Sequence, residues 1–496
     1  MKNKQLTLVV VSLLVVVLSV SLAYFTAQII GKGKDVSVTS TNLQIVFTDP
    51  DGEIAGADIE PGWQKTKTFT VQNNSKSEYK YNIVIKDLVN TFVTNGYLKY
   101  KITSTNNGYN MTEFKDIPKS SVATDTILAY SVVIPNGVTQ SYTIEFKYAN
   151  DESVDQSDDM GKKLSGTLFI TEGTEDPNKT LYNQLLVDKS TKLTRTDFSK
   201  VLTDNNTNTL YTSTEDSKTV YYFAGNATDN WVKFGKNASN QDLYWRIIRT
   251  NSDGSVRLLY HGTSTTATDA YIGESEFNSS YEDIAYVSYM YGSLGSVANA
   301  RANTNNSTIK GVIDTWYKDN LNTNYGKYLS TTAVYCNDRT YTVSGSDTNF
   351  GAYTRLITKK TPSYDCAATE DKFTVETSTG NGKLTYPIAL MTEDEVSFAG
   401  GLWSTNAPTW YYYNSANGSS TNSTWWWLLS PYRWYSSGAY VFYVSGSSRP
   451  GFLNSNGVHI TFGVRPALSL KSCVKYSSGD GSANDPYTIK ETTNGC

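Results

Sequence analysis

The sequence predicts a mainly β protein with a few helices: an N-terminal signal or anchor helix, a β-sandwich, and an α+β domain. Its 496 residues include 37 Tyr, 17 Phe and 10 Trp, set among frequent Asn, Ser, Thr and Gly. Aromatic and β-branched residues between turn-forming residues are typical of antiparallel sheets. Many segments alternate apolar and polar residues, which is the period of a strand with one buried face. The length exceeds one ordinary domain, so we expect more than one.

Residues 1–31 are predicted to direct export. Lys2 and Lys4 precede an apolar run over residues 6–30. Ser21-Leu22-Ala23 fits the cleavage pattern of a removable signal peptide, yet the run is also about the 20 residues that a bilayer-spanning helix needs. Both alternatives stay open, and in the second residues 6–30 anchor the chain in the membrane. Either one places the chain from Lys32 onward outside the cytoplasm, secreted or on the outer face of the cytoplasmic membrane.

Residues 35–172 are predicted to form a β-sandwich. Alternating segments such as 79–85, 98–102 and 141–148 are its strands, and Pro-Gly and Pro-Asn-Gly turns separate them. Residues 173–220 are polar and mixed, so we expect a linker there that holds one short helix over 180–186.

Residues 221–490 are predicted to form the ligand-binding domain. Segments 244–249 and 255–260 flank an Asn-Ser-Asp-Gly turn and predict a hairpin. Apolar residues three and four apart predict a helix over 307–321, and Thr392 is a suitable N-cap for a second helix within 390–398.

The N-terminal third resembles the camelysin/TasA family of biofilm-fibre proteins. The resemblance lies in Ala23-Tyr-Phe-Thr26, in the first strand over 41–45, and in Pro-Gly and Pro-Asn-Gly turns placed before strands. It implies a jelly-roll-like sandwich that assembles into extracellular fibres, so self-assembly through this domain is expected. The metalloprotease activity ascribed to some members is not expected, because the chain has no H-E-x-x-H motif.

The C-terminal half resembles a widespread domain of Gram-positive surface proteins. That domain has W-W-L-x-S-P, a short strand and G-V-R-P-A-L, which match residues 425–431, 439–444 and 463–468 here. The ending is also similar to the C-type-lectin-like fold of formylglycine-generating enzymes and of retroelement-diversified variable proteins. These resemblances imply a displayed binding domain and leave its ligand open.

The four cysteines form two local pairs near the C-terminal end. Because an exported chain meets an oxidising environment, we expect the disulfides Cys336–Cys366 and Cys473–Cys496.

Aromatic loop residues between the motifs of the C-terminal domain are the candidate ligand-binding site. Large aromatics among Ser, Asn and Gly offer rigid contact area, as antibody loops do, and they also stack on sugar rings. The alternative is burial in the core, which we favour for Trp425, Trp426 and Leu428. The predicted site comprises Trp410, Tyr411, Tyr412, Tyr413, Tyr432, Arg433, Trp434, Tyr435, Arg449, Phe452 and Asn454.

Other chemistries have less support in the sequence. A net charge of -4 gives no reason to expect a nucleic-acid partner. His261 and His459 are the only histidines, and neither stands near a nucleophile motif. No cofactor is expected, although clustered carboxylates at residues 49–58 and 151–159 leave a calcium ion possible. Neither cluster has the spacing of an EF-hand loop.

Binding is therefore the favoured function, rather than catalysis. The first hypothesis is a surface or secreted adhesion protein that holds a protein or glycan ligand. The second is a structural subunit of an extracellular fibre or matrix. The third is a hydrolase acting through carboxylates alone.

Overall fold

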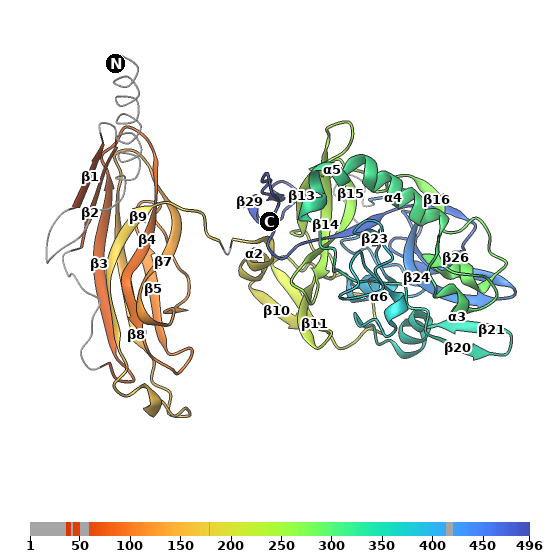
Figure 1. The fold of residues 1–496 in the computed structure, drawn as a ribbon, viewed down its shortest axis with the longest axis horizontal. Coiled ribbons are helices and arrows are strands. Elements are labelled where there is room, and N and C mark those ends of the chain that lie inside the picture. The colour runs from red at the N-terminus through yellow and green to blue at the C-terminus, as the bar shows by residue number, and fades with distance from the viewer. Residues whose placement is uncertain (1–35, 41–42, 50–58, 178, 413–419) are drawn as a thin grey trace, which may run out of the picture. The chain divides into compact units, whose positions relative to one another are not determined.

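The computed structural model describes residues 36–40, 43–49, 59–177, 179–412 and 420–496, which form two compact units, Met1–Pro177 and Asn178–Cys496 (Figure 1). The predicted signal or anchor segment (1–31) and Tyr413 lie outside these residues. Among the described residues, no helix is both long enough and apolar enough to cross a membrane.

The first unit contains two β-sheets. The six-stranded sheet has the order β1 (Val36–Ser40), β2 (Leu43–Thr48), β3 (Gln64–Asn73), β8 (Thr139–Tyr148), β5 (Leu98–Ser104), β6 (Lys115–Asp116). The three-stranded sheet has the order β7 (Ser120–Ile134), β4 (Tyr79–Asn90), β9 (Leu164–Glu172). A short 3-10 helix, η2 (Ser157–Asp159), precedes β9.

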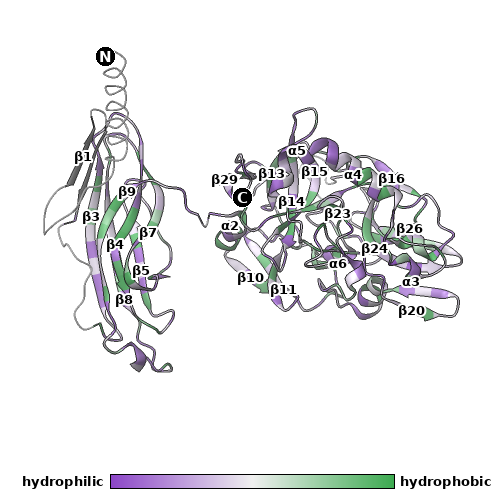
Figure 2. Cartoon of the chain, in the orientation of Figure 1, coloured by the Kyte–Doolittle hydropathy of each residue, from purple (hydrophilic) through white to green (hydrophobic). Residues whose placement is uncertain are grey.

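One apolar core, built from both sheets, holds the first unit together. Alternate residues of β8 are buried, and hydrophobic and hydrophilic positions alternate along the strands (Figure 2). Within the core the Tyr81 hydroxyl donates to Gln140 Oε1 at 2.6 Å, which satisfies a buried polar pair. The predicted β-rich character of residues 35–172 is confirmed, and the jelly-roll-like connection of its strands stays a prediction.

The second unit contains two larger sheets. The ten-stranded sheet has a main path of seven strands: β10 (Thr191–Thr194), β11 (Thr209–Glu215), β12 (Lys218–Tyr222), β14 (Asp242–Thr250), β13 (Trp231–Lys236), β30 (Tyr487–Ile489), β29 (Tyr476–Ser478). It branches from β14 through β15 (Val256–Gly262), β28 (Pro466–Leu470), β23 (Ile388–Leu390).

The seven-stranded sheet carries five of the eleven residues of the predicted site. Its main path is β16 (Glu274–Glu276), β27 (Thr461–Gly463), β24 (Trp426–Tyr435), β21 (Asp347–Phe350), β20 (Tyr341–Ser344). On the other side of β24 follow β25 (Gly438–Val444) and β26 (Leu453–Gly457). Two minor pairs are β17 (Met290–Tyr291) with β18 (Asn305–Asn306), and β19 (Tyr335–Cys336) with β22 (Lys372–Phe373).

The helices of the second unit are short. They are α2 (Leu181–Asp188), α3 (Val297–Ala300), α4 (Thr308–Asn320), α5 (Asn322–Tyr325), α6 (Glu393–Phe398), the 3-10 turns η3 (Ile284–Val287), η4 (Gly326–Tyr328), η6 (Thr369–Asp371), and the π-helical η5 (Tyr353–Lys359). The predicted helices over 307–321 and 390–398 are confirmed. Thr392 forms a capping box with Glu395, so the local sequence signal fixes the start of α6.

The predicted linker over residues 173–220 is wrong for most of its length. The predicted short helix is present as α2, but β10, β11 and β12 belong to the ten-stranded sheet of the second unit. All four side chains of β10 are exposed, so this strand lacks the alternation that marks a half-buried strand. Its pairing partner β11 begins well downstream in the chain, and no local pattern announces such a pairing.

Candidate ligand-binding site

The motif residues of the second unit form its scaffold. Arg246 is buried, and its guanidinium donates to Asn230 Oδ1 at 2.6 Å and to Ala227 O at 2.8 Å. Arg465 is also buried and donates to Tyr260 O at 2.9 Å; burial lowers its pKa to about 9. These arginines satisfy backbone carbonyls in the core, so the motifs encode packing and not ligand contact.

The tryptophan motif at the start of β24 is also part of the core. Trp426, Trp427 and Leu428 are at most 1% exposed. Trp427 Nε1 donates to Ser275 O at 3.0 Å, and Ser430 Oγ accepts from the backbone of Glu393 at 2.9 Å. The core alternative for Trp426 and Leu428 is confirmed, and Trp425 is half-buried against the same core.

Four residues of the predicted site are buried, so the expectation of a single exposed surface is wrong for them. Trp410 and Tyr411 are 0% exposed, Tyr412 is 5% exposed, and Phe452 is 8% exposed. Trp410 Nε1 donates to Phe223 O at 3.0 Å, and the Tyr411 ring packs against Trp426. Their polar neighbours suggested a loop surface, but large rings on an irregular segment can fill the space between two sheets.

Four others follow one another along the end of β24. Tyr432, Arg433 and Trp434 are half-buried, and Tyr435 is 42% exposed. The Arg433 guanidinium carbon lies 3.7 Å from the centre of the Tyr435 ring, within cation–π distance. Tyr432 and Trp434 also pack against the core, whereas Arg433 and Tyr435 meet at the surface.

The last two predicted residues lie near the turn that joins β25 to β26. Arg449 is exposed, with its guanidinium carbon 5.0 Å from the centre of the Phe452 ring. Asn454 is half-buried and its side chain accepts from the backbone of Ser455 at 2.7 Å.

The structure adds two aromatics that the sequence analysis did not place in the site, Trp403 and Tyr353. The Trp403 ring stacks on Tyr432 with centroids 5.1 Å apart and planes 8° apart, and Tyr353 lies 5.2 Å from Tyr432. Buried Phe442 supports both stacked rings edge-on, at 5.7 Å from Trp403 and 5.0 Å from Tyr432. We call the half-buried trio Tyr353, Trp403 and Tyr432 the aromatic platform.

Tyr353 opens the π-helical segment η5. Such segments are rare and often lie at functional sites. Trp403 is held by a β-bridge to Leu453, the first residue of β26. The π-helix had no sequence signal that marked it, and the three platform residues come from segments far apart in the chain.

Three charged side chains near the platform are ion-paired with one another. The Arg355 guanidinium from η5 donates to both carboxylate oxygens of Asp394, at 3.0 and 2.6 Å, and also to Asp338. The space among these ion pairs is about 20 Å³, which is enough for roughly one water molecule. This polar cluster therefore joins η5 to α6, with no room for a ligand.

Glu393 is the exception to this pairing. It is 0% exposed, and within the described chain neither of its carboxyl oxygens has a hydrogen-bond partner. Burial raises the pKa of Glu393 well above its usual range, and the Asp394 carboxylate adds to the shift. The environment of Glu393 therefore disfavours the charged form of its carboxyl group.

The histidines take structural positions. His261 is buried, with Nδ1 3.3 Å from Arg465 Nη2. Burial lowers its pKa well below the usual value, and Arg465 and Arg246 lower it further. The His459 ring lies 4.3 Å from the Tyr281 ring.

The carboxylates of residues 151–159 are used in local hydrogen bonds. Asp159 accepts from the Tyr148 hydroxyl at 2.7 Å, and Asp155 accepts from the backbone of Ser157 at 2.9 Å. In the described parts of the chain, no three acidic, histidine or cysteine side chains gather as a metal site would require. Most of the other predicted calcium segment, residues 50–58, falls outside those parts.

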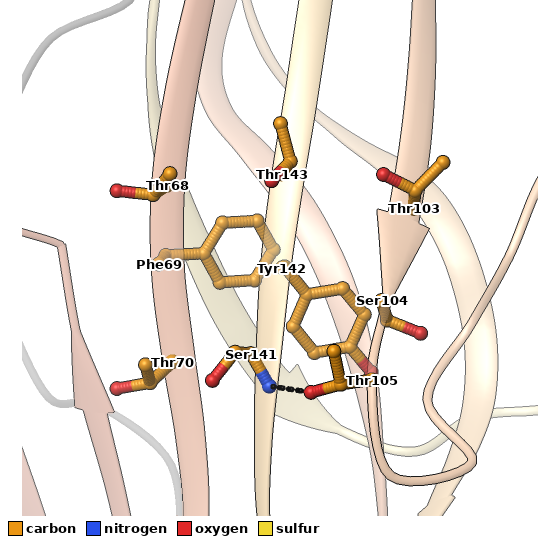
Figure 3. A pocket seen from close by; sticks show the side chains of 9 residues that line it. All are labelled: Thr68, Phe69, Thr70, Thr103, Ser104, Thr105, Ser141, Tyr142 and Thr143. Atoms are coloured by element: carbon orange, nitrogen blue, oxygen red, sulfur yellow. Dashed lines mark hydrogen bonds between the residues drawn. The ribbon is translucent and has the colours of Figure 1, made fainter.

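A hollow of about 450 Å³ lies on the first unit, across β3, β8 and β5 (Figure 3). Thr68, Thr143 and Thr103 are paired in register across the three strands and form one row. The rings of Phe69 and Tyr142 stack 4.7 Å apart but are 2% exposed, so they support the hollow from below. The hollow offers hydroxyl groups without an acid, a base or an exposed ring, and we assign it no chemistry.

Both predicted disulfides are present. Cys336 pairs with Cys366, and Cys473 pairs with Cys496. The first closes the segment that carries β20, β21 and η5, and so helps to hold Tyr353 beside β24.

Comparison with known proteins gives one match. Residues 365–472 match a domain of unknown function, DUF6273. This region includes α6, β24 and the buried Arg465, so the match covers part of the scaffold and two of the three platform residues, Trp403 and Tyr432. No curated protein and no solved structure matches the chain.

Proposed function

We propose that the chain is a cell-surface or secreted binding protein that holds a protein or glycan ligand against the aromatic platform and the adjoining Arg433 and Tyr435. The observation that carries the proposal is the parallel stack of Trp403 on Tyr432 at 5.1 Å. Such a rigid aromatic surface gains contact area on binding with little loss of side-chain entropy.

The surroundings of the platform support ligand binding more than catalysis. Asp338 and Asp394 are both ion-paired with Arg355, and Glu393 is buried. Arg433 adds a cation and hydrogen-bond donors at the edge of the aromatic surface. Half-buried aromatic rings with a hydrogen-bond donor nearby suit a sugar ring or a partner's aromatic side chain.

An extracellular location fits this function. Two disulfides are typical of oxidising compartments, and the basic start with its apolar run predicts export. The camelysin/TasA resemblance of the first unit favours a stalk or assembly role for it.

A glycan array probed with the full-length protein tests the proposal. We expect binding that is lost in the double variant Trp403→Ala/Tyr435→Ala and kept in Leu193→Ala, which removes an exposed apolar side chain from the other sheet. Binding that survives the double variant would refute the platform as the site. An array without any signal would do so too, if no partner protein binds through these residues either.

A further inference from the structure

The strand β20 is an open edge of the seven-stranded sheet. It pairs with β21 on one side, and the described chain places no strand on its other side. Figure 1 shows β20 and β21 as a hairpin that projects from the second unit. All four side chains of β20 are exposed, including Tyr341 at 49% and Val343 at 63%.

The turn of this hairpin fixes which backbone groups face outward. Gly345 and Ser346 form a two-residue loop, with Gly345 at φ +64°, as a type II′ turn requires. Ser344 and Asp347, which flank the loop, are then a hydrogen-bonded pair, and the alternation continues to Thr342 with Asn349. The N–H and C=O groups of Tyr341 and Val343 therefore point away from β21, into the open edge.

Apart from its shortness, this edge lacks the usual protection against pairing. Natural edge strands carry lysines, prolines, bulges or inward charges, whereas residues 341–346 are Tyr-Thr-Val-Ser-Gly-Ser. Two exposed apolar side chains stand on the same strand as two unpaired backbone positions.

The edge is also complementary to itself. We propose that β20 pairs antiparallel with β20 of a second copy of the chain, about a two-fold axis at Thr342. In that register Tyr341 exchanges backbone hydrogen bonds with Val343 of the second copy, and Val343 does so with its Tyr341. The two contacts on that face are aromatic with β-branched, a favourable cross-strand combination. No charged residue of β20 meets a like charge across the axis.

The self-pairing is independent of ligand binding at the platform. It would join second units directly, and it differs from the assembly expected of the first unit. A four-residue strand buries little area compared with the ~1,000 Å² of a stable interface, so the contact is weak in solution and gains strength where many copies are held close together on one surface.

Cysteine crosslinking of the full-length protein tests the register. All four native cysteines are in disulfides, so an introduced cysteine is the sole free thiol. At the axis, two copies of residue 342 form a non-hydrogen-bonded pair with Cα atoms about 4.5 Å apart, within disulfide reach. Two copies of residue 344 are four positions out of register, about 13 Å apart along the strand. Both side chains are exposed, so Ser344→Cys is a matched control for Thr342→Cys.

Under mild oxidation we expect about tenfold more disulfide-linked dimer from Thr342→Cys than from Ser344→Cys. Adding Val343→Pro to Thr342→Cys removes an outward-facing donor and the Val343 side chain, and it leaves the hydrogen bonds to β21 in place. It should reduce the dimer to the level of the control. An unchanged melting temperature checks that the hairpin is intact. Equal crosslinking of the two cysteine variants, no crosslinking of either, or crosslinking that resists Val343→Pro in a folded variant would each overturn the proposal.

Discussion

Glu393 and Glu395 lie two residues apart in α6, both fully buried, and their pKa values are shifted in opposite directions. Burial acts to raise the pKa of Glu395, but the guanidinium groups of Arg257 and Arg249 lower it below the usual value. These groups lie 2.7 and 2.9 Å from Glu395 Oε1. Glu393 has no such partner within the described chain, and burial raises its pKa.

Glu393→Gln should change the pH dependence of stability. Above pH ~4.3 the unfolded chain ionises Glu393 while the folded chain keeps its proton, so wild-type stability falls as pH rises toward the folded pKa, by up to ~1.4 kcal/mol per pH unit. Glutamine does not titrate. The melting temperature of the variant relative to wild type should therefore increase between pH 5 and pH 8. Exposed Glu274→Gln is the control and should show no such trend. Parallel curves for wild type and Glu393→Gln would mean that Glu393 is ionised in the fold.

Glu395→Gln should destabilise the second unit. The change keeps the side-chain shape but leaves Arg249 and Arg257 with less compensating charge in the core, at a cost of about 3–5 kcal/mol in the free energy of unfolding. Urea unfolding at pH 7 measures it. Asp242→Asn removes half-exposed ion pairs with Lys233 and Lys236 and should cost about 1 kcal/mol or less. Because the Glu395 pKa is lowered, its stabilisation is present at neutral pH and is lost as pH falls below ~4.3. The loss on substitution should shrink in that range, and equal losses at pH 7 and pH 3 would contradict the assignment.

Local signals in the sequence account for the features that were predicted correctly. Ser307 and Thr392 cap α4 and α6 through side-chain oxygens, as N-cap residues do. The pairing of Cys336 with Cys366 was predicted because the four cysteines fall into two separate pairs along the chain and the expected compartment is oxidising. Each of these features depends on residues close together in the chain.

The features that were missed depend on distant contacts. The polar strand β10 becomes recognisable only through its pairing with β11. The platform needs Trp403 and Tyr353 to meet Tyr432, and no periodicity links these three segments. Trp410 has loop-like neighbours, yet its indole N–H finds the carbonyl of Phe223 in the core.

Removal of the disulfide with Cys336→Ser/Cys366→Ser should lower stability by about 3–4 kcal/mol, because the open loop gains freedom in the unfolded chain. Thermal unfolding without reductant measures the change. The same pair of substitutions at Cys473 and Cys496 is the comparison, since that disulfide joins residues 23 apart in the sequence. If Cys336→Ser/Cys366→Ser is as stable as the wild type, the pairing is refuted. Peptide mapping that joins Cys336 to Cys473 would also refute it.

The predicted site divides into core and surface residues, and a pair of alanine substitutions separates them. Trp410 is 0% exposed and Tyr435 is 42% exposed. Trp410→Ala should remove about 3–5 kcal/mol from the free energy of unfolding, since it leaves a large cavity and takes away the indole donor to Phe223 O. Tyr435→Ala should change stability by no more than ~0.5 kcal/mol, because its ring contacts Arg433 at the surface.

For any ligand identified on the array, the expected order of the two variants reverses. At a temperature where both variants are folded, Tyr435→Ala should weaken binding more than Trp410→Ala does. If Tyr435→Ala costs as much stability as Trp410→Ala, the end of β24 is core rather than surface. If it costs none and binding is also unchanged, the ligand does not contact Tyr435.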